Sequence, residues 1–181
     1  MTISLHLYRT RGVEGGIVDL EAIAEISRLK YRYARALDTK AWADFADTLL
    51  PDATATYAEH LRFDSRDAFV SFMQDTLGPH VITEHHCGHP EIDVHGDTAT
   101  GIWYLSDTVV VPGDQMMMHG AAFYQDRYAK DAAGRWKIAH TEYERTYESV
   151  YSLADMPSFR LTSNRWSLIS SPQSGVPGVA P

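Results

Sequence analysis

The chain has 181 residues, of which 44% are hydrophobic and 22% are charged, and its formal net charge is −8. This length and composition are typical of one globular domain with a sizeable core. The negative charge argues against a nucleic-acid backbone or an anionic membrane surface as a partner, because both are bound by basic faces.

The two ends of the chain differ in composition from its middle. Residues 1–16 end in a Gly pair and predict a loose extension, whereas residues 151–181 form a tail whose last ~12 residues are Ser-, Pro- and Gly-rich, which predicts disorder. The domain is therefore expected over residues 17–150. The single cysteine, Cys87, excludes an internal disulfide. Since the N-terminus shows no signal-peptide pattern either, we expect a cytoplasmic protein.

Three helices are predicted in the first half of the chain. Apolar residues recur at spacings of three and four over 19–37, after Asp19 as a candidate N-cap. Thr39 is a candidate N-cap for a second helix, which carries its apolar face to Leu49 and ends before Pro51. A short strand is predicted over 53–57. Ser65 is a candidate cap for a third helix, which ends at the Gly-Pro pair 78–79.

Four β-rich segments follow, over 82–94, 98–111, 116–129 and 135–150. The turns between them are short, which predicts antiparallel hairpins. Helices first and a long meander afterwards indicate an α+β fold, in which a curved antiparallel sheet is wrapped by three N-terminal helices and encloses a pocket. Segment 98–111 is apolar on both alternating faces, so one face can line the pocket and the other must meet helices or another subunit.

The segment EHHCGHPE, residues 84–91, concentrates groups that can bind metals or transfer protons. Alternation along a strand places His85, Cys87 and His89 on one face and His86 on the other. A zinc site needs three or four converging ligands, and no second Cys and His cluster completes one, so we expect no metal. His85 and His89 are interpreted as polar residues on a half-exposed strand.

Two carboxylates could work with a histidine of this segment. Asp38 follows the first helix, where it could also simply begin a turn, and Asp107 lies inside an apolar strand, where it could also face solvent. A carboxylate that orients an imidazole makes a general base near neutral pH. Tyr33 and Tyr57 lie on apolar faces, where tyrosine is either core or a hydroxyl donor.

The stretch LKYRYARALDTKAWADFADTLLPDATATY (29–57) resembles the opening of the SnoaL-like family of cone-shaped α+β proteins, and GAAFYQDRYAKDAAGRWKIAHTEYER (120–145) resembles its closing strands. The resemblance runs over about residues 18–150. It implies a metal- and cofactor-independent dehydratase that eliminates water from a hydroxylated steroid or bile-acid-like ketone.

The resemblance also implies roles for single residues. It assigns the general base to His86, its orientation to Asp38, and oxyanion stabilisation to Tyr33. Asp107 would be a protonated acid for the leaving hydroxyl, with a pKa raised by its apolar surroundings. Arg145 would anchor a distant anionic group of the substrate, or else pair with Glu142, Glu144 or Glu148.

Further substrate-binding residues are expected at Tyr57, Trp103 and His119, the last standing where the family pattern has an asparagine. The expected ligand is a small apolar hydroxylated molecule, either a free acid or linked to coenzyme A. A homo-oligomer, a trimer rather than a dimer, is expected. The alternatives are an isomerase, a cyclase or an epoxide hydrolase on the same fold, or a non-catalytic small-molecule-binding module.

Overall fold

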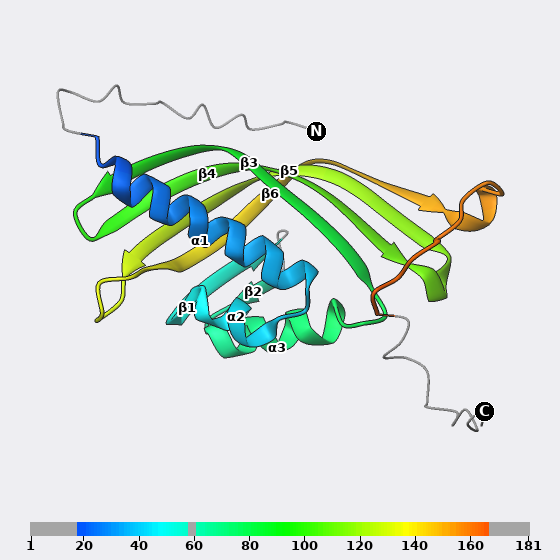
Figure 1. Cartoon of the computed structure of the whole chain (residues 1–181), viewed down its shortest axis with the longest axis horizontal. Helices are drawn as coiled ribbons and strands as arrows, with labels where there is room; N and C mark the ends of the chain where they lie inside the picture. Colours follow the sequence, from blue (N-terminus) through cyan, green and yellow to red (C-terminus); the bar gives the residue numbers. More distant parts are fainter. Residues whose placement is uncertain (1–17, 58–60, 167–181) are drawn as a thin grey trace, which may run out of the picture.

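The computed structural model describes residues 18–57 and 61–166 (Figure 1). The loose extension predicted over residues 1–16 and the disorder predicted for the last dozen residues of the tail both lie outside the described residues. The helices are α1 (Leu20–Asp38), α2 (Trp42–Asp47) and α3 (Arg66–Thr76). The strands are β1 (Leu49–Tyr57), β2 (Leu61–Phe63), β3 (Ile82–His95), β4 (Thr98–Val111), β5 (Met116–Lys130) and β6 (Trp136–Ser152).

The strands form one curved, open sheet with the order β2-β1-β6-β5-β4-β3, and the helices lie on its concave side (Figure 1). The predicted α+β fold is thus confirmed. The long strands β3 to β6 pair antiparallel, as their short turns predict. After β6 the chain forms a short 3-10 turn, Leu153–Asp155, and folds back in the view of Figure 1. No helix among the described residues is long and apolar enough to cross a membrane.

Helix α1 forms where the sequence predicts it and carries a functional residue at its end. Asp19 caps it by accepting a hydrogen bond from the Ala22 amide at 3.0 Å. Ile26 and Tyr33 are completely buried on the face that packs against the sheet. The last helical residue is Asp38, which this packing brings beside β3.

The connection after α1 differs from the sequence prediction. Thr39 does not cap α2, because its hydroxyl donates at 2.7 Å to the Arg35 carbonyl and so closes α1. Leu49 begins β1 instead of ending α2. Pro51 lies inside this strand, at the register shift between Leu49 and Thr54, where its missing N–H costs no ladder hydrogen bond.

Strand register brings distant residues of the sheet together. His85 of β3 lies opposite Asp107 of β4, and Asp107 lies opposite Gly120 of β5. Strand β1 pairs parallel with β6, which local sequence patterns do not predict, and this pairing sets Tyr57 opposite Tyr143. The concave face therefore collects polar side chains from β1, β3, β4 and β6.

A buried ion pair lies deep in the cone. Lys30 of α1 and Asp126 of β5 are 2.8 Å apart, and both side chains are completely inaccessible to solvent. The Lys30 ammonium also lies 3.4 Å from the centre of the Tyr124 ring. The Tyr128 hydroxyl donates to Asp126 at 2.6 Å, and the Trp103 indole donates to that hydroxyl at 2.9 Å. This network fixes α1 on the sheet.

The outer face of the sheet is partly apolar. Phe123 and Tyr147 are 43% and 49% exposed, and Tyr151 near the end of β6 is exposed as well. Inner residues of β4 such as Leu105 are buried and line the pocket, as predicted for one face of this strand. The expected homo-oligomer stays a prediction.

Candidate active site

A half-open pocket of about 210 Å³ lies between the helices and the concave face of the sheet. Its apolar wall comes from α1, α3, β2, β4 and β5, and consists of Leu37, Leu61, Phe72, Met73, Leu77, Leu105, Val109 and Met118. Its polar lining consists of Tyr57, Thr76, His85, Asp107, Tyr124, Tyr143 and Arg145. An apolar wall with a few convergent polar groups is the usual form of a small-molecule site.

Asp38 and His85 form a dyad at the edge of this pocket. The His85 ring Nδ1 is 2.7 Å from Asp38 Oδ1, and the His85 amide donates to Asp38 Oδ2 at 2.9 Å. Because a carboxylate only accepts hydrogen bonds, Nδ1 carries a proton, and Nε2 of the neutral ring then has the lone pair. His85 lines the pocket, so this lone pair belongs to a base that is available to a bound ligand.

The predicted pairing of Asp38 with His86 is wrong. Alternation along β3 turns Thr83 and His85 toward Asp38, whereas His86 is exposed and makes no hydrogen bond to it. His86 lines a groove between α1 and β3, which Asp38 and His85 also line from their other side. The sequence pattern separates the two faces of β3 correctly but does not tell which of them meets the end of α1.

Two further residues hold Asp38 in place. The Thr83 hydroxyl donates to Asp38 Oδ1 at 2.9 Å, and the Lys40 ammonium donates to Thr83 at 3.0 Å. Burial lowers the pKa of Lys40 to about 8, although the Asp38 charge works in the opposite direction. Sequence reasoning missed both residues, since neither stands in a recognisable motif.

Lys40 should make stability depend on pH in the alkaline range. Its ordinary pKa is 10.5 and its folded pKa is about 8, so between these values the unfolded chain binds more protons. The free energy of unfolding therefore gains a contribution that rises with pH over this window. Denaturant unfolding between pH 8 and pH 10.5 should show a smaller rise for Lys40→Met than for the wild type. Equal slopes would contradict the lowered pKa of the half-buried Lys40.

Asp107 and Arg145 form the second charged pair of the pocket. The guanidinium donates to both carboxylate oxygens, with Nη2 at 2.7 Å from Oδ2, and Asp107 is only 4% exposed. Burial alone lowers the pKa of Arg145, but hydrogen bonds and the charge of Asp107 outweigh it and raise that pKa. Glu148 lies 3.4 Å from Arg145 Nε.

This geometry corrects two expectations. Both Asp107 oxygens accept hydrogen bonds from Arg145, so the carboxyl group faces its ion-pair partner in place of a leaving hydroxyl. The main partner of Arg145 is Asp107, and of the three expected glutamates only Glu148 comes near it. Glu142 instead lies 3.4 Å from His140.

Gly120 makes room for this pair. A Cβ at that position would stand 2.6 Å from Arg145 Nη1 and 2.9 Å from the Tyr147 carbonyl oxygen. Gly120→Ala must therefore displace the guanidinium or the neighbouring backbone, and we expect it to lower the free energy of unfolding by about 1–3 kcal/mol. Denaturant unfolding measures this loss.

The matched control is Gly113→Ala, because a Cβ at Gly113 meets nothing within 4 Å. It should stay within about 0.5 kcal/mol of the wild type. Equal losses in the two variants would show that Gly120 has no special role beside Arg145.

Tyrosine hydroxyls form the remaining polar wall. Tyr57 lines the pocket and its hydroxyl is hydrogen-bonded to that of Tyr33. Burial raises the pKa of Tyr57, so the phenol keeps its proton and can donate it in a hydrogen bond. Tyr33 is completely buried behind Tyr57 and does not line the pocket, so the expected direct contact with substrate is wrong. Sequence reasoning missed Tyr124 and Tyr143, which also line it.

Two expected substrate-binding residues lie elsewhere. Trp103 is completely buried and its indole donates a hydrogen bond to Tyr128, so it belongs to the core. His119 points away from the pocket, where its ring contacts Tyr147. Its neighbour Met118 lines the pocket instead, because successive side chains on a strand alternate.

A metal centre is not assembled within residues 18–57 and 61–166. No group of three or more His, Cys, Asp and Glu side chains converges there. Cys87 is a free thiol, and burial raises its pKa.

Comparison with known proteins finds one family model and several solved structures of similar fold. A family model described as a SnoaL-like domain matches residues 18–142. A candidate scytalone dehydratase from Novosphingobium aromaticivorans DSM 12444 is 22% identical, with 73% of this chain and 89% of that chain covered and a TM-score of 0.68. The LinA-type3 hexachlorocyclohexane dehydrochlorinase from Novosphingobium barchaimii LL02 is 17% identical, with 74% and 92% covered and a TM-score of 0.66.

A third solved structure, ActVI-ORFA from Streptomyces coelicolor, is 15% identical, with 70% of this chain and 98% of that chain covered and a TM-score of 0.60. At such low identities these likenesses show a shared fold.

Proposed function

This chain belongs to the SnoaL-like domain family, and we propose that it is a carbon–oxygen lyase that removes water from a hydroxylated polycyclic ketone. The single observation that carries the proposal is the Asp38–His85 dyad at the edge of an apolar pocket. Structural neighbours named for dehydration and for dehydrochlorination support an elimination, in which the substrate loses a proton and a leaving group.

The proposed reaction begins with proton removal. His85 Nε2 takes a proton from the carbon next to, or conjugated with, the substrate carbonyl, and the C–H electrons move into the carbonyl as an enolate. Asp38 stabilises the imidazolium that forms. The Tyr57 hydroxyl, backed by Tyr33, donates a hydrogen bond to the enolate oxygen.

The second step releases water. The enolate electrons return to form a carbon–carbon double bond, and the C–O bond to the neighbouring hydroxyl breaks. The imidazolium of His85 returns its proton to the departing oxygen, so water leaves and the base is restored. Asp107 and Arg145 support this step by binding a polar group of the substrate, since they place charge on an otherwise apolar wall.

The proposed substrate class follows from the apolar wall and from the motifs. YARALD, HCGHPEI and TATGIWYLSD resemble those of bile-acid 7-alpha-dehydratase. The cavity of about 210 Å³ is smaller than most pockets for drug-sized ligands, so the reacting ring would lie inside and the rest of the molecule at the mouth. Phe72 and Leu77 of that wall would contact this outer part.

The test is an elimination assay with three substrates: a 7-hydroxy-3-oxo-4-ene steroid acid, its thioester and a smaller hydroxylated polyketide ketone. We expect loss of water by mass and growth of the long-wavelength absorbance of the extended dienone. A product of unchanged mass would indicate an isomerase or cyclase. Binding without conversion of any compound would indicate a ligand-binding module and overturn the proposal.

A further inference from the structure

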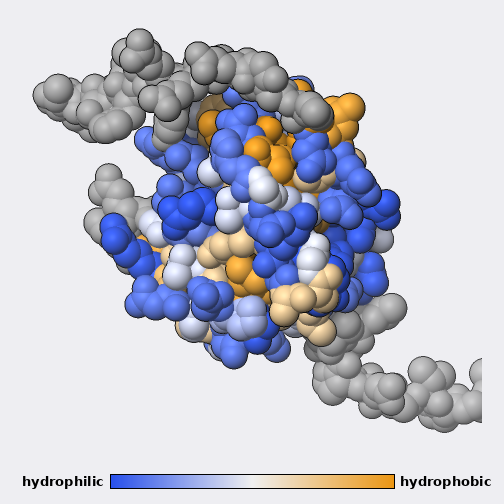
Figure 2. Space-filling model, turned by 90° about the vertical axis from the view of Figure 1, so that its left-hand side faces the viewer, coloured by the Kyte–Doolittle hydropathy of each residue, from blue (hydrophilic) through white to orange (hydrophobic). Residues whose placement is uncertain are grey.

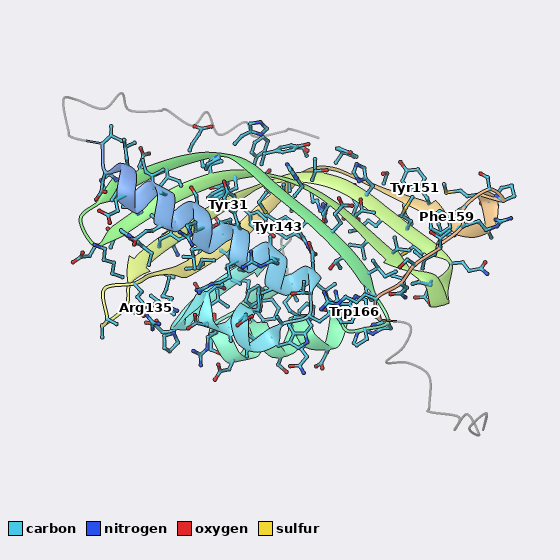
Figure 3. The ribbon with its side chains drawn as sticks, viewed as in Figure 1. Tyr31, Arg135, Tyr143, Tyr151, Phe159 and Trp166 are labelled. Atoms are coloured by element: carbon cyan, nitrogen blue, oxygen red, sulfur yellow. The ribbon has the colours of Figure 1, made fainter. Side chains whose placement is uncertain are left out.

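A second groove lies on the other side of α1, between this helix and the start of β6. It measures about 480 Å³ and shares no lining residue with the pocket of about 210 Å³, whereas Tyr31 and Arg35 also line the groove that contains His86. Its walls consist of Glu25, Arg28, Leu29, Tyr31, Arg32, Arg35, Asp47, Gly134, Arg135, Trp136 and Lys137. Figure 3 shows Tyr31 on α1 and Arg135 at the β5–β6 turn. Hydrophilic residues cover most of this end of the molecule in Figure 2.

The groove is strongly basic although the chain is acidic. Five of its side chains are cationic and two are carboxylates, whereas the whole chain has a net charge of −8. Arg28, Arg32 and Arg35 follow one another at spacings of four and three, which puts them on one face of α1. Like charges at these spacings destabilise a helix, so helix stability does not account for them.

Neighbouring carboxylates neutralise only part of this charge. Asp47 lies 3.2 Å from Arg32 and 2.8 Å from Lys137. Arg135 is paired with Asp131 at 2.8 Å. Within the described ranges, Arg28 and Arg35 form no ion pair or side-chain hydrogen bond. Two guanidinium groups therefore remain for an anion.

Buried donors in the groove also lack acceptors. Trp136 is 5% exposed, and its indole Nε1 is buried without a hydrogen-bond partner in the described structure. The Nε of Arg32 is likewise buried without a hydrogen-bond partner in the described structure. Buried polar atoms are nearly always hydrogen-bonded, so such atoms in the wall of a basic groove indicate a missing acceptor.

We propose that this groove binds a small molecule that bears a diphosphate, such as a nucleoside diphosphate. Guanidinium groups bind phosphate oxygens through paired, charge-assisted hydrogen bonds, and Arg28 and Arg35 present two of them. Tyr31 is 48% exposed in the same wall and offers an aromatic face for a base. The volume lies within the usual range for small-molecule sites.

Calorimetric titration of the full chain with inorganic pyrophosphate and with ADP tests this proposal. Both should bind, and both should bind more weakly as salt concentration rises. Arg28→Glu/Arg35→Glu should weaken binding of both about tenfold or more. Tyr31→Ala should weaken ADP but not pyrophosphate.

The matched control is Arg127→Glu, an exposed charge reversal on β5 outside the groove. It should change the affinity by less than about twofold, and circular dichroism should show that every variant is folded. The proposal is overturned if neither probe binds at millimolar concentration. It is also overturned if Arg127→Glu weakens binding as much as the double variant does.

Discussion

Replacing His85 by alanine should lower kcat/KM for the elimination by about 10²–10⁴-fold, which is the usual contribution of a general base. His85 is the histidine that Asp38 orients, through a ring nitrogen at 2.7 Å and a backbone amide at 2.9 Å. The loss should appear in kcat rather than in KM, because the imidazole stabilises the transition state of proton transfer more than the bound substrate. Steady-state kinetics with the dienone assay measures it.

The neighbouring histidine supplies the control for this experiment. His86→Ala removes the same side chain one residue further along, from an exposed position that makes no hydrogen bond with Asp38. It should leave kcat and KM close to those of the wild type. Loss of activity in His86→Ala with activity retained in His85→Ala would reverse the assignment and restore the one made from the sequence.

The largest effect on stability is expected at Asp126. Asp126→Ala leaves the ammonium of Lys30 fully buried without its counter-ion, which lies 2.8 Å away in the native protein. Breaking a buried ion pair in this way costs about 3–5 kcal/mol. Denaturant unfolding should show the loss, and Asp126→Asn, which can still accept a hydrogen bond from Tyr128, offers a milder variant if Asp126→Ala does not fold.

A paired substitution separates the charge from the packing. Lys30→Met/Asp126→Leu removes both charges and keeps apolar volume, and such replacements are often neutral or stabilising. The double variant should therefore be more stable than Asp126→Ala. A double variant as unstable as Asp126→Ala would mean that the ion pair itself is not what Asp126 contributes.

The sequence predicts the fold well because its signals are local. The caps at Asp19 and Ser65 and the four long strands all follow from residue spacing and turn composition. The sequence does not place Thr39 correctly, because a threonine can cap the helix after it or close the helix before it. Only the path of the chain, with Lys40 at a φ of 55°, decides between them.

The site is less predictable because its contacts are non-local. Asp38, Asp107 and Arg145 stand out in the sequence as single residues. The ion pair between Asp107 and Arg145, however, depends on the register of three strands and on the absence of a side chain at Gly120. The parallel pairing of β1 with β6 brings Tyr143 beside Tyr57 from far along the chain. No periodicity within one segment contains that information.

The distinction between His85 and His86 shows the same limit most clearly. Alternation along β3 assigns the two rings to opposite faces, and a shift of one residue exchanges them. Which face turns inward depends on the docking of α1, whose last residue binds Thr83 and His85. A resemblance between motifs does not distinguish His85 from His86, whereas the hydrogen bond between His85 and Asp38 does.

The central claim is that Asp38 holds His85 as a base with a free Nε2. Long-range proton–nitrogen NMR of the histidine rings tests it most directly, with His85→Ala and His86→Ala used to assign the two resonances. The account predicts that neutral His85 carries its proton on Nδ1 and that Asp38→Ala abolishes this preference while His86 is unaffected. A His85 ring protonated on Nε2, or an effect of Asp38→Ala on His86 alone, would contradict it.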